Sequence, residues 1–219
     1  MFIRSERLFL RPIWPEDWAD LHAGLNDGEI VKNLSRVPWP YTADKAREFS
    51  SMQHHPRLPH FMITRPCGAH GVDTIGGIGL ADADGQPALG YWIARDHWGQ
   101  GYATEAGRAV LSVARTLGHR RIMARHFLDN PASGRVLRKL GFTPTGGGEE
   151  FSLGRGVAAP SMAYVLDLDA PTNCDGDLGG DGMGSDGRGS DGRGSDGRGG
   201  DGRGGDGMGR GRFPARRAA

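Results

Sequence analysis

The C-terminal part of the chain is a repeat that cannot form a folded core, and this limits where the fold can lie. From Asp181 an aspartate recurs every five residues, and the clearest unit reads Ser-Asp-Gly-Arg-Gly. Residues 171–219 hold 18 of the 38 glycines and one aromatic residue, Phe213. Such a segment buries too little apolar surface to offset the entropy of ordering it. We therefore expect a disordered Gly/Asp/Arg repeat tail over residues 171–219 and one folded domain over residues 1–170.

Two functional alternatives for this tail compete with an inert segment. Arg-Gly repeats can bind RNA, but each repeat arginine here is matched by an aspartate and no aromatic residue interleaves to stack on bases. Only the end, from Arg210 to Arg217, is basic. Calcium-binding β-rolls use a nonapeptide unit with a buried apolar position, which this repeat lacks. An inert tail is the favoured interpretation, and we expect no nucleic-acid partner.

The composition excludes several classes of protein. The sequence has no run of 18 apolar residues, and its first residues lack the apolar stretch of a signal peptide. Its two cysteines, Cys67 and Cys174, cannot form a disulfide framework or a metal-ligand cluster. A net charge of +1 gives no strong field toward nucleic acid or anionic lipid. We expect a cytoplasmic protein with no bound metal and no membrane partner.

Residues 1–170 alternate between strand and helix patterns. Helices are expected from Pro15, from a cap at Thr42, from Tyr102 to Leu117, and from a cap at Asn130 to Leu140. Strands are expected at 7–11, 60–64, 73–81, 88–94, 121–127, from Phe142 onward and at 161–168. This order predicts an α/β layer structure with a mixed, mainly antiparallel sheet flanked by helices.

The most informative segment is a strand that enters a glycine turn and then a helix, Trp98-Gly99-Gln100-Gly101-Tyr102-Ala103-Thr104. A helix start offers free N–H groups and a partial positive charge, and glycines let an anion approach the backbone, so the segment suits a phosphate. No lysine follows in the pattern of a nucleotide-triphosphate loop. Gly77-Ile78-Gly79 lacks the third glycine of a dinucleotide site. A plain glycine turn remains an alternative at this point.

Three segments together resemble a known family. Residues 90–106, with Gly-Tyr-Trp-Ile followed by Trp-Gly-Gln-Gly-Tyr-Ala-Thr, closely resemble the acetyl-CoA site of the GNAT-superfamily N-acetyltransferases. Residues 129–142 resemble the second cofactor segment of its Rim-type branch, and residues 5–12 resemble that branch's usual opening. The resemblance covers about residues 3–168. It implies a single GNAT-like domain with acetyl-CoA as the acetyl donor.

The resemblance also implies roles for single residues. The pyrophosphate would bind the backbone N–H groups of Gln100, Gly101, Tyr102, Ala103 and Thr104. The pantetheine would lie along Tyr91, Trp92 and Ile93 like an added strand, with an N–H near Ile93 steadying the oxyanion. Asn130 would contact the cofactor, a role compatible with that of a helix cap.

Two positions depart from the wider family pattern, one at the phosphate turn and one among the catalytic residues. Trp98 stands where many relatives have Gln or Arg, and Leu137 stands where many have a tyrosine that protonates the leaving thiolate. Ser133 matches the serine proposed for that role in the Rim-like branch, and we expect it to donate a hydrogen bond to the sulfur. The alternative for Ser133 is an ordinary first-turn serine.

The general base is less well defined. Ala88 occupies the position of a glutamate that is frequent in the branch, which leaves Asp82, Asp84, His97 and Glu149 as candidates. For each of these four, an ordinary surface residue is the favoured interpretation. Glu105 is expected to be structural, as an acid in the first helical turn. A missing base is compatible with an α-amine acceptor, whose pKa of about 7.7–8.0 leaves a substantial fraction already deprotonated.

The sequence therefore predicts an enzyme that moves the acetyl group of acetyl-CoA to a primary amine by direct attack. The acceptor is either a protein N-terminus or a small-molecule amine, and residues 37–41 would help to shape its cleft. The enzyme would be a monomer or a homodimer. The alternative is a catalytically weak acyl-CoA-binding protein, or an RNA-associated protein acting through its Arg/Gly tail.

Overall fold

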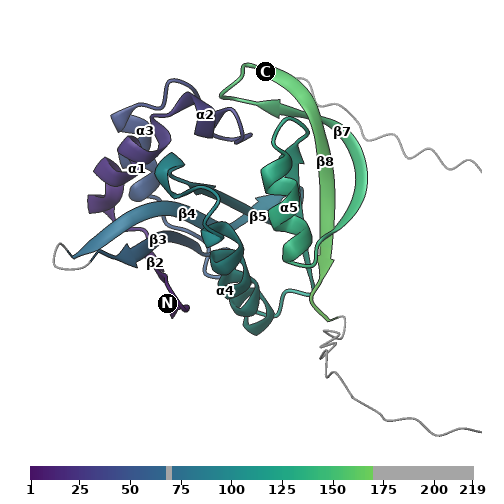
Figure 1. The fold of residues 1–219 in the computed structure, drawn as a ribbon, viewed down its shortest axis with the longest axis horizontal. Coiled ribbons are helices and arrows are strands. Elements are labelled where there is room, and N and C mark those ends of the chain that lie inside the picture. The colour runs from purple at the N-terminus through teal and green to yellow at the C-terminus, as the bar shows by residue number, and fades with distance from the viewer. Residues whose placement is uncertain (68–70, 170–219) are drawn as a thin grey trace, which may run out of the picture. The chain divides into compact units, whose positions relative to one another are not determined.

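The computed structural model describes residues 1–67 and 71–169, and these form one folded unit (Figure 1). The expected tail over residues 171–219 lies outside the described residues. Among the helices of the described part, none has the length and apolarity needed to cross a membrane.

An eight-stranded sheet forms the centre of the domain, in the order β1-β2-β3-β4-β5-β6-β8-β7. Its strands are β1 (Ile3–Arg4), β2 (Phe9–Pro12), β3 (His60–Pro66), β4 (Val72–Ala83), β5 (Gln86–Ile93), β6 (Arg121–Phe127), β7 (Thr143–Ser152) and β8 (Val157–Asp167). Every neighbouring pair is antiparallel except β5 and β6, which are parallel. The prediction of a mixed, mainly antiparallel sheet is confirmed.

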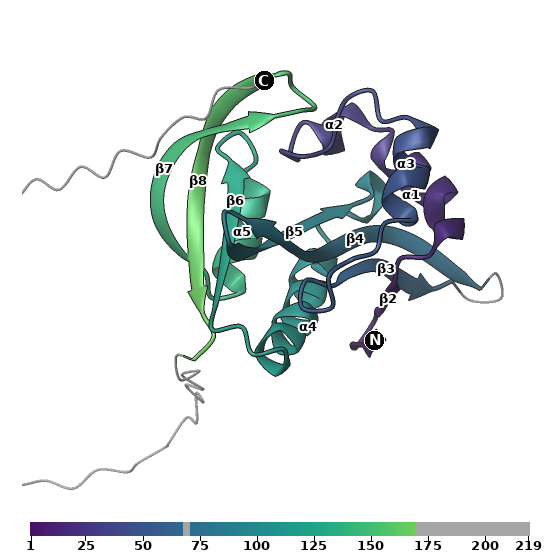
Figure 2. The same cartoon turned by 180° about the vertical axis from the view of Figure 1, so that it is seen from behind.

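Helices cover both faces of this sheet (Figures 1 and 2). On one face α4 (Tyr102–Thr116) and α5 (Pro131–Lys139) pack on the main core, which includes Leu80, Leu89 and Val110. On the other face α1 (Trp18–Leu25), α2 (Gly28–Val31) and α3 (Ala43–Ser50) enclose a smaller core around Leu21 and Met62. The burial of one apolar stripe per helix fixes this layered arrangement.

The predicted helix starts are present. Thr42 Oγ1 accepts a hydrogen bond from the Lys45 N–H (3.3 Å), and Asn130 Oδ1 accepts one from the Ser133 N–H (3.2 Å). Each cap satisfies one of the donors that a helix start leaves unpaired. Gly141, with φ +89°, follows the end of α5 in the left-handed conformation that glycine favours.

Several elements differ from the sequence-based expectation. The short strand β1, the helix α2 and the 3₁₀ turn Arg95–His97 have no counterpart in it. The last two strands are longer than expected and form a hairpin, with Glu149 paired to Pro160. Gly146-Gly147-Gly148 and Pro160 have weak strand propensity, so cross-strand pairing and not local preference creates this hairpin.

The parallel strands β5 and β6 pair at a single position, Ala88 with Met123. By contrast, β5 is paired with β4 along its whole length, from Gln86 to Ile93. The carboxyl half of β5 therefore keeps one edge without a strand partner among the described residues. This free edge leads directly into the glycine turn before α4.

Candidate functional site

The turn between β5 and α4 has the geometry of an anion site. Gly99 and Gly101 have φ of +76° and +82°, and Gly101 is the N-cap residue of α4. The N–H groups of Thr104 and Glu105 both donate to the Gly101 carbonyl (3.1 Å). Within the described residues no carbonyl or side chain accepts from the N–H groups of Gln100, Gly101, Tyr102 and Ala103. Four N–H groups are thus available to a phosphate at the positive end of the helix.

The carboxylate of Glu105 links this turn to Ser5 and Arg7 of the N-terminal segment, and this set of contacts forms a clasp. Its Oε1 accepts from the Ser5 hydroxyl (2.7 Å) and the Arg7 N–H (2.7 Å), and its Oε2 accepts from Arg7 Nε (2.8 Å). Burial alone would raise the pKa of Glu105, but these donors and the Arg7 charge hold that pKa below its ordinary value. Glu105 is therefore structural, as the sequence predicts.

Arg7 also brings a positive charge to the glycine turn. Its guanidinium donates to the Gln100 carbonyl (3.1 Å) and lies over the Tyr102 ring, 4.6 Å from its centroid. A Cβ added at Gly101 would lie 3.5 Å from Arg7 Nη2. An anion bound at the turn would therefore meet both backbone N–H groups and a fixed arginine.

Trp98 fastens the turn to the end of β5. Its indole Nε1 donates to the Ile93 carbonyl at 2.7 Å. This bond holds the chain close to the free edge of β5 as it enters the 3₁₀ turn and then the glycines. The tryptophan thus has a structural part to play where many relatives carry Gln or Arg.

Tyr91 and Ser133 come together from facing elements. The Tyr91 hydroxyl on β5 lies 2.8 Å from the Ser133 hydroxyl in the first turn of α5. Burial raises the pKa of Tyr91 to about 12, with the Ser133 hydrogen bond acting in the opposite direction. The Asn130 cap fixes the backbone of Ser133 at the same place. Two residues with separate predicted roles, Tyr91 for the cofactor and Ser133 for catalysis, are hydrogen-bonded partners.

Trp92 and Ile93 place only their backbone at the free edge. Trp92 packs against the smaller core, where a Cβ added at Gly77 would lie 2.6 Å from its Nε1. Ile93 is buried in the main core on the opposite face. Any contact of these two residues with a cofactor along β5 would be a backbone contact.

The face of β5 opposite Tyr91 has an open position at Gly90. Along a strand alternate residues share a face, so Gly90 lies on the side of Ala88 and Trp92. Gly90 is exposed, and a Cβ added there would meet no atom within 4 Å. The open space beside the free edge of β5 can therefore admit a second molecule.

His60 lies in the same cross-strand row as Gly90, and the sequence did not predict that His60 would be near the site. His60 pairs with Gly79 across β3 and β4, and Gly79 pairs with Gly90 across β4 and β5. Burial is the largest cause that lowers the pKa of His60 to about 4, and the charges of His54 and Arg36 act in the same direction. The imidazole is neutral at pH 7. The strand register places His60 in the row of Gly90 although the two residues are far apart in the sequence.

The four predicted base candidates lie on different elements. Asp82 and Asp84 are at the β4–β5 turn, where Asp82 Oδ2 accepts from the Gly85 N–H (3.4 Å). His97 is in the 3₁₀ turn before Trp98, and its ring centroid lies 6.2 Å from that of Tyr102. Glu149 is exposed on the edge strand β7. The structure does not gather these groups into one cluster.

The tip of the β7–β8 hairpin docks on the segment after α2. The Leu153 N–H donates to the Ser35 carbonyl (2.9 Å), and the Ser152 hydroxyl donates to the Leu34 carbonyl (3.0 Å). A Cβ at Gly154 would come within 3.1 Å of the carbonyl oxygens of Val31 and Val37. This contact joins the β7–β8 end of the sheet to the chain after α2, next to the segment 37–41 that the sequence predicts for the acceptor cleft.

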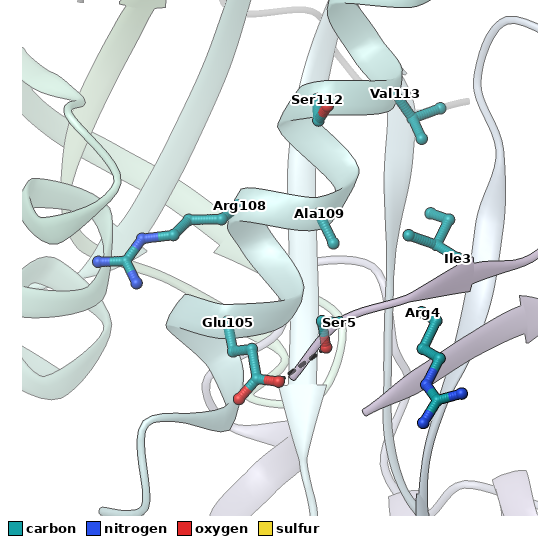
Figure 3. A pocket seen from close by; sticks show the side chains of 8 residues that line it. All are labelled: Ile3, Arg4, Ser5, Glu105, Arg108, Ala109, Ser112 and Val113. Atoms are coloured by element: carbon teal, nitrogen blue, oxygen red, sulfur yellow. Dashed lines mark hydrogen bonds between the residues drawn. The ribbon is translucent and has the colours of Figure 1, made fainter. Parts of the chain in front are cut away.

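A surface pocket of about 400 Å³ lies on the β1 side of α4 (Figure 3). Its lining residues are Ile3, Arg4, Ser5, Glu105, Arg108, Ala109, Ser112 and Val113. Figure 3 shows the Ser5–Glu105 hydrogen bond at this wall, while Arg108 projects to the other side of the helix. The pocket borders the clasp and contains none of the predicted site residues.

Comparison with known proteins identifies the family of this chain. The family model of the acetyltransferase (GNAT) domain matches residues 7–143. The uncharacterized N-acetyltransferase YoaA of Bacillus subtilis is 27% identical over 170 residues, which cover 75% of this chain and 95% of YoaA. The shared family model spans β2 through the start of β7, and so includes both the glycine turn and Ser133.

Two solved structures share the fold. The ribosomal L7/L12 α-N-protein acetyltransferase RimL, in complex with coenzyme A, matches with a TM-score of 0.65 at 21% identity, over 78% of this chain and all of that one (100%). The spermidine N-acetyltransferase of Vibrio cholerae, in complex with coenzyme A and spermine, matches with a TM-score of 0.63 at 20% identity, over 74% of this chain and 96% of that one.

Gly101→Val tests the anion site. The substitution places a branched side chain where φ is +82° and where a phosphate would approach the N–H groups, so we expect acetyl-CoA affinity to fall by about tenfold or more. Gly85→Val is the matched control, because Gly85 has φ +80° at the β4–β5 turn and imposes the same backbone strain away from the site. Calorimetric titration of both variants measures the effect. Equal affinity losses would assign the effect to strain alone.

Glu105→Gln tests the clasp. Because the pKa of Glu105 is lowered in the folded state, its charge stabilises the fold above the ordinary value of 4.5, and this stabilisation is lost as the pH falls through the folded-state pKa. At pH 7 we expect the variant to lose about 1–2 kcal/mol of unfolding free energy, and we expect the difference from wild type to vanish at acid pH. Urea unfolding over a pH series measures this. The exposed Glu149→Gln is the control, and a pH-independent difference would contradict the assignment.

Proposed function

Because the chain belongs to the GNAT acetyltransferase family and is an acetyl-CoA-dependent N-acetyltransferase, we propose that its acceptor is an α-amino group. The observation that carries this proposal is the open face of β5. Ala88, Gly90 and Trp92 on that face carry no titratable group. The neighbouring imidazole, His60, has a pKa of about 4 and is a weak base. Such a site suits an amine of which a substantial fraction is already deprotonated near neutral pH.

The donor site in this proposal uses the backbone more than side chains. The free N–H groups of residues 100–103 and the Arg7 guanidinium would hold the pyrophosphate. The sequence also assigned the Thr104 N–H to this group, but that N–H already donates to the Gly101 carbonyl. The free edge of β5, from Tyr91 to Ile93, would hold the pantetheine as a partial added strand. Asn130 would reach the cofactor from the α5 start. The fit rests on unpaired N–H groups and an unpaired strand edge, both suited to this ligand.

In the proposed reaction, residues around the opening of the sheet orient the thioester and the amine. Acetyl-CoA supplies an acetyl thioester. The space over Gly90 admits the amine, and a backbone N–H near Ile93 stabilises charge on the carbonyl oxygen as the C–N bond forms. Ser133 donates a hydrogen bond to the sulfur as the C–S bond breaks. The amine nitrogen loses one proton and the leaving thiol gains one, so the reaction needs no net proton from the enzyme.

The acid-base requirement distinguishes α-amines from other acceptors. An α-amine has a pKa of about 7.7–8.0, whereas a lysine has a pKa near 10.4, so at pH 7.5 the free-base fractions differ by more than a hundredfold. An enzyme that acts on lysine or a polyamine gains more from a strong general base. The position of a frequent branch glutamate is Ala88 here. This favours a Rim-type reaction on an α-amine over one on a polyamine.

The proposed activity is assigned to residues 1–170. The family model and the site residues lie within this range. No part of the proposed mechanism uses residues 171–219, and the proposal includes either a monomer or a homodimer.

Acceptor choice is the direct test of the proposed function. Thiol release from acetyl-CoA is measured with a peptide that has a free α-amine and no lysine, with its N-acetylated counterpart that contains one lysine, and with spermidine. We expect kcat/KM to be at least tenfold higher for the α-amine, and to rise with pH up to the pKa of that amine. Preference for lysine or spermidine would contradict the α-amine proposal. Absence of thiol release with every amine would contradict the transferase function.

Gly90→Val tests the acceptor space. Valine fits a strand, and its side chain would enter space in which a Cβ meets no atom within 4 Å, so the fold should tolerate it. We expect the KM for the amine to rise by about tenfold with little change in acetyl-CoA affinity. Gly147→Val is the control, because Gly147 is also an exposed strand glycine and its added Cβ makes an ordinary contact at 3.7 Å. An unchanged amine KM would place the acceptor elsewhere.

A further inference from the structure

We propose that Tyr91 is a positioning residue for the thiolate donor: its phenol donates to Ser133 Oγ and leaves the serine's own proton free for the sulfur. This inference rests on the proposed function, and it gives Tyr91 a side-chain role in addition to any backbone contact with the cofactor. The two hydroxyl oxygens are 2.8 Å apart.

The contact lies where the sheet opens. Tyr91 is three residues beyond Ala88, the last residue of β5 that pairs with β6. Ser133 is in the first turn of α5, which follows β6. The hydrogen bond therefore connects the two sides of the opening, at the level where a thioester lying along the free edge of β5 would end.

Two bonds together determine the orientation of Ser133. Its N–H donates to Asn130 Oδ1 at 3.2 Å, which fixes the backbone of the first turn. The Tyr91 hydroxyl fixes the position of the side-chain oxygen. A serine hydroxyl has one proton and can also accept, so a donor at Oγ leaves that one proton for another acceptor.

The chemistry of the two hydroxyls sets the direction of the bond. A phenol is more acidic than an aliphatic alcohol, so it is the better donor of the pair. Burial raises the pKa of Tyr91 to about 12, which keeps the phenol protonated throughout the working pH range. Donation from Tyr91 also polarises the serine hydroxyl and makes it a stronger donor to the sulfur.

The proton balance is simple. The C–N bond forms, the C–S bond breaks, and the sulfur leaves with the electron pair of that bond. Ser133 stabilises the growing negative charge by donating a hydrogen bond, and Tyr91 keeps its own proton. The amine nitrogen loses one proton and the thiol gains one, so the number of protons on the enzyme does not change.

A double-mutant cycle tests the proposal. We expect Ser133→Ala to lower the single-turnover rate by about 10²-fold, and Tyr91→Phe to lower it by about tenfold, with acetyl-CoA affinity within twofold of wild type. Because Tyr91 acts through Ser133, the double variant should be no slower than Ser133→Ala alone. Additive losses, or a Tyr91→Phe rate equal to wild type, would overturn the proposal.

Two further measurements separate positioning from general stability. Tyr164→Phe is the control, because Tyr164 is a buried phenol that bonds His126 and Arg138 and has no part in the proposed site. We expect it to lower the melting temperature without changing the single-turnover rate. Replacement of Tyr91 by a difluorotyrosine keeps the hydrogen bond and lowers the phenol pKa. The rate of that variant should fall at high pH where the wild-type rate does not, and a shared pH profile would count against the proposal.

The cycle also separates this proposal from the proposed function. Thiol release by the wild-type protein with an amine establishes the transferase, whatever the variants do. The rates within the cycle then decide the role of Tyr91 alone. Wild-type turnover with a normal Tyr91→Phe rate would overturn the positioning role and leave the transferase intact.

Discussion

The end of the β5–β6 pairing at Ala88 and Met123 is the constraint on which the rest of the site depends. Beyond that pair β5 keeps the strand conformation because β4 holds its other edge as far as Ile93. An unpaired strand edge inside a domain is a site where another extended molecule can add. The free edge, the glycine turn that follows it and the start of α5 follow one another at this opening, and the proposed donor site uses all three.

Fixed charges and dipoles at the site are held by contacts that are distant in sequence. Glu105 binds Ser5 and Arg7, and this places the arginine beside the free N–H groups of the turn. Because these groups are oriented in the folded protein before any ligand binds, little free energy is spent on ordering them when an anion binds. In the proposed donor site, stability and acetyl-CoA binding would depend on the same carboxylate, so we expect Glu105 variants to affect both.

Local signals in the sequence predicted the helix caps and the glycine turn, because Thr42, Asn130 and Gly101 act on residues within a few positions of themselves. The contacts that define the chemistry are not local. Tyr91 meets Ser133 across 42 residues, and His60 reaches the row of Gly90 only through the register of β3 and β4. Residue type and spacing alone do not encode such register. The hairpin of β7 and β8 was underestimated for the same reason, since its glycines form strands only when paired.

Position 137, which holds a leucine and not a tyrosine, is part of the hydrophobic core. Leu137 is 1% exposed and belongs to the main core, so the position that many relatives use for a phenol is a packing position here. A phenol placed there without a partner would bury an unsatisfied hydroxyl. In this chain β5 supplies a phenol from the opposite wall of the opening, through Tyr91. Ser133 stands beside this phenol. In the proposed mechanism, thiolate stabilisation would therefore depend on two residues acting as a unit.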